Sequence, residues 1–130
     1  MKHKTSELTG AQLDQAVAKS LGYSFCAEID QQVVSGDGGM AVFFSSCYAV
    51  IDRQLVRFSP SSCWRDGGPI IERKRISVME DADERGTWHA CMEFNFQGGI
   101  YGPNGEGATH LIAAMRALVD AEYGAEVELP

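Results

Sequence analysis

The chain lacks long apolar runs and an excess of positive charge. Its unbroken apolar runs, such as residues 40–44, are no longer than five residues, far below the roughly 20 that cross a bilayer. With 11 Lys and Arg against 18 Asp and Glu, the net charge is −7, which argues against general binding to nucleic acids. The first residues also lack the apolar core of a signal peptide. We therefore expect a cytoplasmic protein that does not bind membranes.

Closely paired cysteines are absent as well. Cys26, Cys47, Cys63 and Cys91 are widely spaced and form no Cys-x-x-Cys pair. This pattern is typical of reduced thiols in an intracellular protein, and it does not predict a metal site.

Standard catalytic motifs are missing too. The chain has no Walker A loop, no Gly-x-Gly-x-x-Gly, no His-Glu-x-x-His and no Gly-x-Ser-x-Gly, so neither a cofactor nor an ordinary enzyme is expected. His89 and Cys91 share one face of a predicted strand, but this spacing does not bring a base to the thiol. The acidic residues 80–84 lack the pattern of a calcium loop and are expected to form a solvated turn.

A helix is predicted at residues 10–21. Thr9 and Gln12 have the spacing of a capping box, and Leu8 and Leu13 have that of a hydrophobic staple. The apolar stripe of this helix is Leu13, Ala16, Val17 and Leu21.

A second helix is predicted between Thr109, as its cap, and Gly124, as its end. Residues 126–129 then alternate like a short closing strand. The buried stripe of the helix is Leu111, Ala114, Met115, Leu118 and Val119.

The segments between these helices are rich in aromatic and β-branched residues. Asp37 and Gly38 suit a hairpin turn, and residues 98–107 are expected to be a turn. We predict a single α+β domain over residues 1–130, an antiparallel sheet with the N-terminal and C-terminal helices packed on it. The predicted strands are residues 23–29, 40–44, 48–58, 76–79 and 88–96.

Residues 58–73 form the candidate binding segment. Six of the 11 Lys and Arg lie between Arg53 and Arg75, so this part of an acidic chain is locally basic. A short helix that begins at Pro69 would offer free N–H groups to an anion, and a loop tryptophan could stack on a base or sugar. The tentative ligand residues are Trp64, Arg65, Gly67, Gly68, Pro69 and Arg73. The alternative is a tight turn in which Trp64 covers the core.

Arg116 interrupts the apolar face of the second helix. It is either a structural arginine that binds carbonyls or a carboxylate, an exposed residue, or a further ligand contact near residues 58–73.

Three segments carry a resemblance to a known family. They are KTSELTGAQLDQAVA at residues 4–18, FSPSSCWRDGGPIIER at residues 58–73 and GATHLIAAMR at residues 107–116. Together they resemble the NinX family of tailed-phage and prophage proteins, which are accessory proteins of unknown biochemical function. The chain departs from the family pattern at His110, where proline is expected, and at Cys63. The last segment is also similar to phage alpha-beta-alpha sandwich domains.

The resemblance implies an accessory protein that is made inside a bacterial host cell, and it supplies no catalytic residues. Our leading hypothesis is a non-enzymatic module that binds a small anionic ligand, such as a nucleotide, at residues 58–73. The alternative is an adaptor that binds a host or phage protein through Trp64. An unrecognised enzyme is the third hypothesis.

Overall fold

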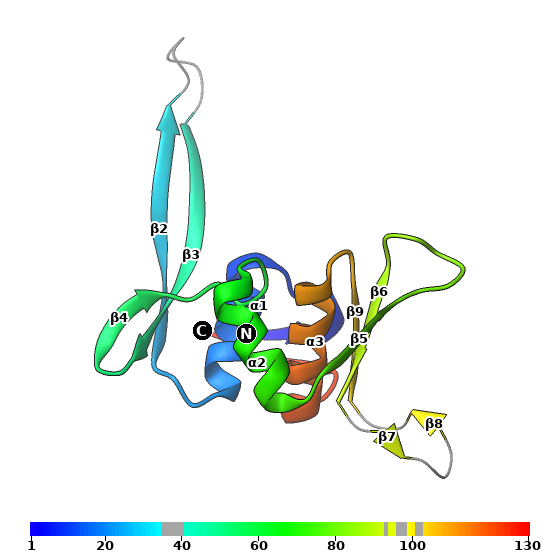
Figure 1. Cartoon of the computed structure of the whole chain (residues 1–130). Coiled ribbons are helices and arrows are strands. Elements are labelled where there is room, and N and C mark those ends of the chain that lie inside the picture. Colours follow the sequence, from blue (N-terminus) through cyan, green and yellow to red (C-terminus); the bar gives the residue numbers. More distant parts are fainter. Residues whose placement is uncertain (35–40, 93, 96–98, 101–102) are drawn as a thin grey trace.

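The computed structural model describes residues 1–34, 41–92, 94–95, 99–100 and 103–130 (Figure 1). The helices are α1 (Gly10–Ser20), α2 (Trp64–Lys74) and α3 (His110–Tyr123), with a short 3-10 turn, η1 (Thr5–Glu7). The strands are β1 (Lys2–Lys4), β2 (Phe25–Val34), β3 (Ala41–Ile51), β4 (Gln54–Arg57), β5 (Ser77–Glu80), β6 (Trp88–Cys91), β7 (Phe94–Asn95), β8 (Gly99–Ile100), β9 (Asn104–Gly107) and β10 (Glu126–Glu128).

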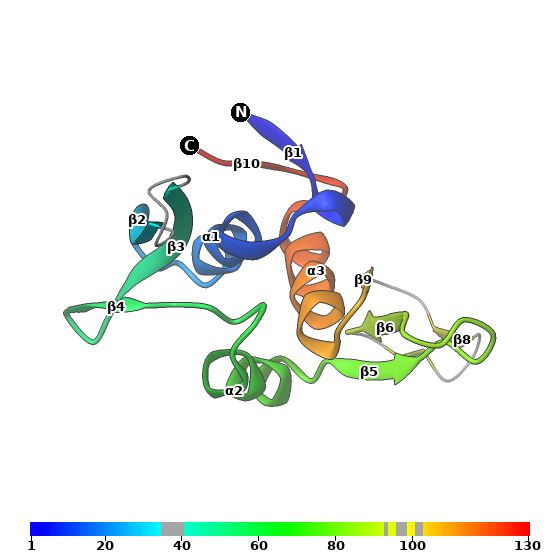
Figure 2. The same ribbon diagram turned by 90° about the horizontal axis from the view of Figure 1, so that it is seen from above.

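The predicted α+β class is confirmed, and every strand pairing that the structure describes is antiparallel. The strands are divided among small sheets, two of which have the orders β2-β3-β4 and β5-β6-β9. Figure 2 shows α1 and α3 side by side between these two sheets. The layer order therefore differs from an alpha-beta-alpha sandwich, because here the helices are central and the sheets flank them.

The two helices predicted from periodicity are confirmed as α1 and α3. At α3 the hydroxyl oxygen of Thr109 accepts a hydrogen bond from the N–H of Ile112 at 3.1 Å, as expected of a cap. At α1 Thr9 occupies the cap position, but its side chain makes no cap hydrogen bond, so the predicted capping box is wrong. Leu8 and Leu13 are both buried, which agrees with a hydrophobic staple. No helix in the described part of the chain is long and apolar enough to cross a membrane.

The β2-β3-β4 sheet differs from the prediction in its strand boundaries. The strands predicted at residues 40–44 and 48–58 have other boundaries: residues 41–51 form one long strand, β3, and after a turn residues 54–57 return as β4. Asp52 and Arg53 make this turn with positive φ angles of 52° and 66°, a conformation that usually selects asparagine or glycine. The unusual residues explain why the turn was missed. The predicted Asp37-Gly38 turn lies outside the described residues.

The stretch predicted as a turn at residues 98–107 contains strand β9, so that prediction is wrong in part. Glycine usually signals a turn, but Gly105 and Gly107 are needed here for close packing. A Cβ on Gly105 would lie 2.3 Å from the carbonyl oxygen of Ala113, and one on Gly107 would lie 2.6 Å from Ile112. The two glycines therefore let β9 lie directly against α3. The predicted strand at residues 88–96 is likewise divided, into β6 and β7.

The strands at the two ends of the described chain pair with each other. β1 pairs with β10, with Lys2 opposite Glu128. The N–H of Thr5 then donates to the carbonyl oxygen of Ala125 at 2.8 Å. These bonds bring η1 beside the C-terminal end of α3.

The predicted core is confirmed. Leu13 and Val17 of α1 and Leu111, Met115 and Leu118 of α3 are buried in one cluster, and Leu21 packs against it partly buried. The same cluster includes Val127 of β10 and Ala90 of β6, so α3 is surrounded by core contacts.

Leu118→Ala tests this core. Leu118 is 5% exposed, and its truncation should lower the free energy of unfolding by about 2–5 kcal/mol, because the lost contacts leave a cavity. Leu55→Ala is the control, since Leu55 is 59% exposed and its truncation should change stability by less than about 0.5 kcal/mol. Urea denaturation measures both values, and an equally small loss in Leu118→Ala would show that α3 packs through another face.

Candidate functional site

The predicted binding segment contains α2, which begins at Trp64 and not at Pro69. The loop before the helix is tightened by hydrogen bonds from the N–H groups of Ser62 and Cys63 to the carbonyl oxygen of Ser59, at 3.1 and 2.8 Å. Asp66 lies in the first turn, where a carboxylate is favourable, and its side chain accepts from the N–H of Ser59 at 3.0 Å. These contacts favour an early helix start.

Pro69 is therefore an interior residue of α2, and the predicted anion site at a helix beginning with Pro69 is wrong. Gly67 is also explained by packing, because a Cβ there would lie 2.5 Å from the carbonyl oxygen of Pro60 and 2.7 Å from Leu111. Gly67 thus lets α2 approach the start of α3. Gly68, by contrast, has only Trp64 near its missing Cβ, at 3.7 Å.

Trp64 is not a lid on the core, since 57% of its surface is exposed. Its ring centroid lies 5.7 Å from that of His110, and His110 in turn stacks on Trp88 at 3.6 Å. The three rings form an aromatic row that joins α2, α3 and β6.

A surface depression of about 300 Å³ lies beside this row. Trp64 is the first residue of α2 and His110 is the first residue of α3, so two helix N-termini meet here. Both ends carry the partial positive charge of a helix dipole. We call this depression the Trp64 depression; it is lined by Ser61, Ser62, Trp64, Thr109, His110, Leu111 and Ile112.

Of the two arginines predicted in this segment, only Arg65 lies near the Trp64 depression. Arg65 follows Trp64, is largely exposed, and has its Nε 3.7 Å from a carboxylate oxygen of Asp66. Arg73 lies in the last turn of α2, about 13 Å further along the helix axis at 1.5 Å per residue. Its charge there complements the C-terminal end of the helix dipole. Trp64 and Arg65 are thus neighbours, and Arg73 lies at the other end of the helix.

Arg116 does not line the Trp64 depression. Its Nε donates to the carbonyl oxygen of Leu8 at 3.0 Å, and its Nη1 donates to that of Glu106 at 2.7 Å. Arg116 therefore binds carbonyls, as one of the sequence alternatives stated. Burial lowers the pKa of the guanidinium from its usual high value, while the charge of Glu106 acts in the opposite direction.

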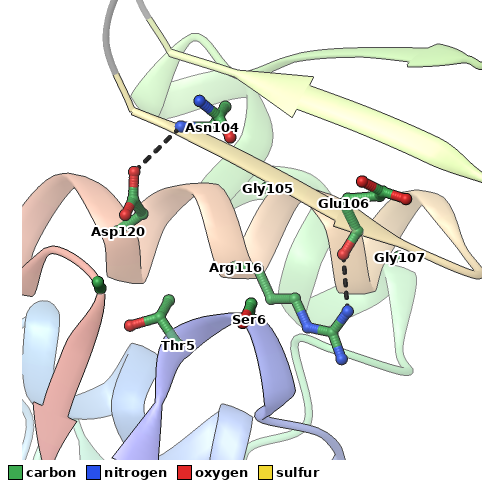
Figure 3. A pocket seen from close by; sticks show the side chains of 9 residues that line it. Thr5, Ser6, Asn104, Gly105, Glu106, Gly107, Arg116 and Asp120 are labelled. Carbon is green, nitrogen blue, oxygen red and sulfur yellow. Dashed lines mark hydrogen bonds between the residues drawn. The ribbon is translucent and has the colours of Figure 1, made fainter.

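Arg116 borders a second depression, of about 440 Å³, on the β9 side of α3 (Figure 3). Asp120, one helical turn further on, lines the same space and accepts a hydrogen bond from the N–H of Asn104 at 3.2 Å. Sequence reasoning missed Asp120, although its spacing of four residues from Arg116 places both side chains on one helix face. We call this space the Arg116 pocket; it is lined by Thr5, Ser6, Asn104, Gly105, Glu106, Gly107, Arg116, Asp120 and Ala125.

The acidic turn at residues 80–84 carries a side-chain hydrogen bond that the sequence did not reveal. The carboxylate of Asp81 lies 2.7 Å from Nε2 of His89, and it also accepts from the N–H groups of Asp83 and Glu84. These bonds, that from His89 above all, lower the pKa of Asp81. His89 thus holds the turn in place, whereas Cys91 of the same strand is buried.

All four cysteines are present as thiols. Burial raises the pKa of Cys47 to about 12, with smaller contributions from the charges of Asp14 and Cys26. Such a thiol stays protonated and unreactive at neutral pH.

A comparison with known families identifies the chain. The model of the family described as "Bacteriophage P22, NinX" matches residues 4–121, which is most of the chain. The protein therefore belongs to the NinX family of bacteriophage proteins, as the three sequence segments implied. No curated protein shows significant similarity to it.

Asp14 of α1 forms a hydrogen bond with the loop before α2. It is 4% exposed, and its Oδ1 accepts from the N–H of Ser61 at 2.8 Å. Burial raises the pKa of Asp14 from 3.8 to about 6; hydrogen bonds from Ser61 oppose this shift, and the nearby charge of Asp66 adds to it.

The titration of Asp14 should make stability depend on pH. Because its pKa is higher in the folded state than in the unfolded state, the resulting stabilisation is complete below about pH 4 and is lost as the pH rises through about 6. Relative to Asp14→Asn, which does not titrate, the parent protein should gain about 1 kcal/mol of unfolding free energy between pH 7 and pH 5. Urea denaturation at both pH values measures this, and parallel pH profiles of the two proteins would contradict it.

Proposed function

We propose that this phage accessory protein is a non-enzymatic binding module that acts in the host cytoplasm and holds a small anionic ligand, such as a nucleotide, in the Trp64 depression. The observation that carries the proposal is an exposed indole at a concave surface where two helices begin. An exposed tryptophan offers a stacking surface for a base, and helix N-termini favour phosphate.

The first turns of both helices have N–H groups to offer. In α3, Thr109 accepts from the N–H groups of Ile112 and Ala113. Within the described residues, the N–H groups of His110 and Leu111 have no such partner, so they can donate to a ligand.

In α2, the carbonyl oxygen of Cys63 accepts from the N–H groups of Asp66 and Gly67. Within the described residues, the N–H groups of Trp64 and Arg65 have no such partner, so they too can donate to a ligand. The side chain of Arg65, next to Trp64 in the chain, is largely exposed, and its positive charge steers an anion more than it binds one.

The binding mode differs from the one that the sequence predicted. Gly67 lets α2 pack closely on α3, Pro69 is an exposed interior residue of α2, and Arg73 and Arg116 lie elsewhere. The ligand contacts proposed instead come from Ser62, Trp64, Thr109 and His110, which line the depression; Arg65, the neighbour of Trp64, adds a nearby charge.

A second candidate function is an adaptor that binds a host or phage protein through Trp64. The shallow depression and the exposed indole favour it, because tryptophan is a frequent anchor of protein interfaces. Under this alternative no small anion needs to bind, although Trp64 remains essential.

Ligand titrations with AMP, ATP, GTP and inorganic phosphate test the first proposal. A nucleotide at about 100 times its dissociation constant should add roughly 2.7 kcal/mol to stability, which thermal shift detects. Trp64→Ala should abolish this effect. Arg65→Ala should weaken binding and its salt dependence, whereas Arg73→Ala, the same charge change at the other end of α2, should leave binding unaltered.

Two outcomes would contradict the ligand proposal. One is the absence of any stabilisation by these nucleotides. The other is an equal effect of Arg65→Ala and Arg73→Ala, which would indicate unspecific attraction to a basic segment. If nucleotides fail while Trp64→Ala abolishes capture of a specific protein partner, the adaptor is favoured.

A further inference from the structure

The Arg116 pocket is separate from the Trp64 depression and lies on another side of α3. Its walls are β9, α3 and η1, together with Ala125 near the chain end. Figure 3 shows the guanidinium of Arg116 directed to Glu106 and the carboxylate of Asp120 directed to Asn104, at two places along β9. The pocket therefore has a positive and a negative group on the same wall.

These opposite charges do not neutralise each other directly. Among the residues that the structure describes, no ion pair within 4.0 Å joins Arg116 to Asp120, although a spacing of four residues often permits one. Both side chains are engaged with backbone groups of β9 instead. Two opposite charges that do not pair with each other match a ligand that itself carries both charges.

Each charged group is held in place but keeps binding capacity. A guanidinium has five N–H donors, of which Arg116 uses one toward Leu8 and one toward Glu106. The carboxylate of Asp120 accepts from Asn104 through Oδ2, and a carboxylate has about four acceptor positions. Groups that are oriented by the protein bind a ligand with a smaller loss of side-chain entropy.

We propose that the Arg116 pocket binds a free α-amino acid or a closely similar small zwitterion. The ligand's carboxylate would lie on Arg116 and its ammonium group on Asp120. The volume of about 440 Å³ admits an amino acid with its side chain. Thr5 is not a competing donor, because its hydroxyl donates to the carbonyl oxygen of Gly124 at 2.7 Å.

NMR titration of the intact protein with the 20 standard amino acids tests this inference. At least one amino acid should shift the backbone amide signals of Gly105 and Gly107. Its N-acetyl derivative lacks the ammonium group and its amide lacks the carboxylate, so each should bind at least about tenfold more weakly, since hydrogen bonds to charged groups are the strong ones. This comparison needs no variant and so does not depend on the folding of one.

Asp120→Asn adds a second readout, with Glu122→Gln as its matched control. Both changes remove one carboxylate from α3, but Glu122 is exposed and does not line the pocket. In Asp120→Asn, the dissociation constants of the N-acetyl derivative and of the amino acid should have a ratio of about one. In Glu122→Gln this ratio should equal that of the parent protein.

Three results would overturn the proposal. The first is that no amino acid shifts the signals of β9. The second is that the derivatives, acetate or phosphate bind as tightly as the amino acid, which would indicate a simple anion site at Arg116. The third is that Asp120→Asn retains the parent's preference for the free ammonium group.

Discussion

The close contact between α3 and β9 is the constraint on which the rest of the structure depends. Helix and strand approach so closely that no Cβ fits at Gly105 or Gly107. This contact fixes α3 against the β5-β6-β9 sheet, and α1 and the chain ends pack on the remaining faces of α3. It also sets both depressions, because it places His110 beside Trp88 and brings Arg116 within 2.7 Å of the carbonyl oxygen of Glu106.

Much of the fold could be predicted because it depends on local patterns. Apolar periodicity located α1 and α3, and Thr109 and Gly124 marked the limits of α3 correctly. Two of the errors have a common cause, which is that tertiary packing overrode a local signal. Glycines that read as a turn became the close-packed strand β9. Likewise the early start of α2 depends on the bond between Asp66 and Ser59, which no residue pattern reveals.

The candidate sites were less predictable because they join distant parts of the chain. The sequence identified Trp64 as an unusual loop aromatic, and the structure shows it exposed. It did not identify His110 as its neighbour, since the two residues meet only when α2 packs on α3. Arg116 was recognised as an interruption of an apolar face. Its partners were not, because Leu8 follows η1 and Glu106 lies in β9, both outside the helix that contains Arg116.

The stability of Gly105→Ala tests the central role of the α3–β9 contact most directly. The added methyl group would lie 2.3 Å from the carbonyl oxygen of Ala113, so β9 must move and the free energy of unfolding should fall by about 1–3 kcal/mol or more. Gly68→Ala is the control, because its missing Cβ has ordinary space within α2 and alanine favours a helix by up to about 1 kcal/mol. Urea denaturation should therefore show a loss of stability for Gly105→Ala and none for Gly68→Ala. A Gly105→Ala protein as stable as the parent would contradict the account.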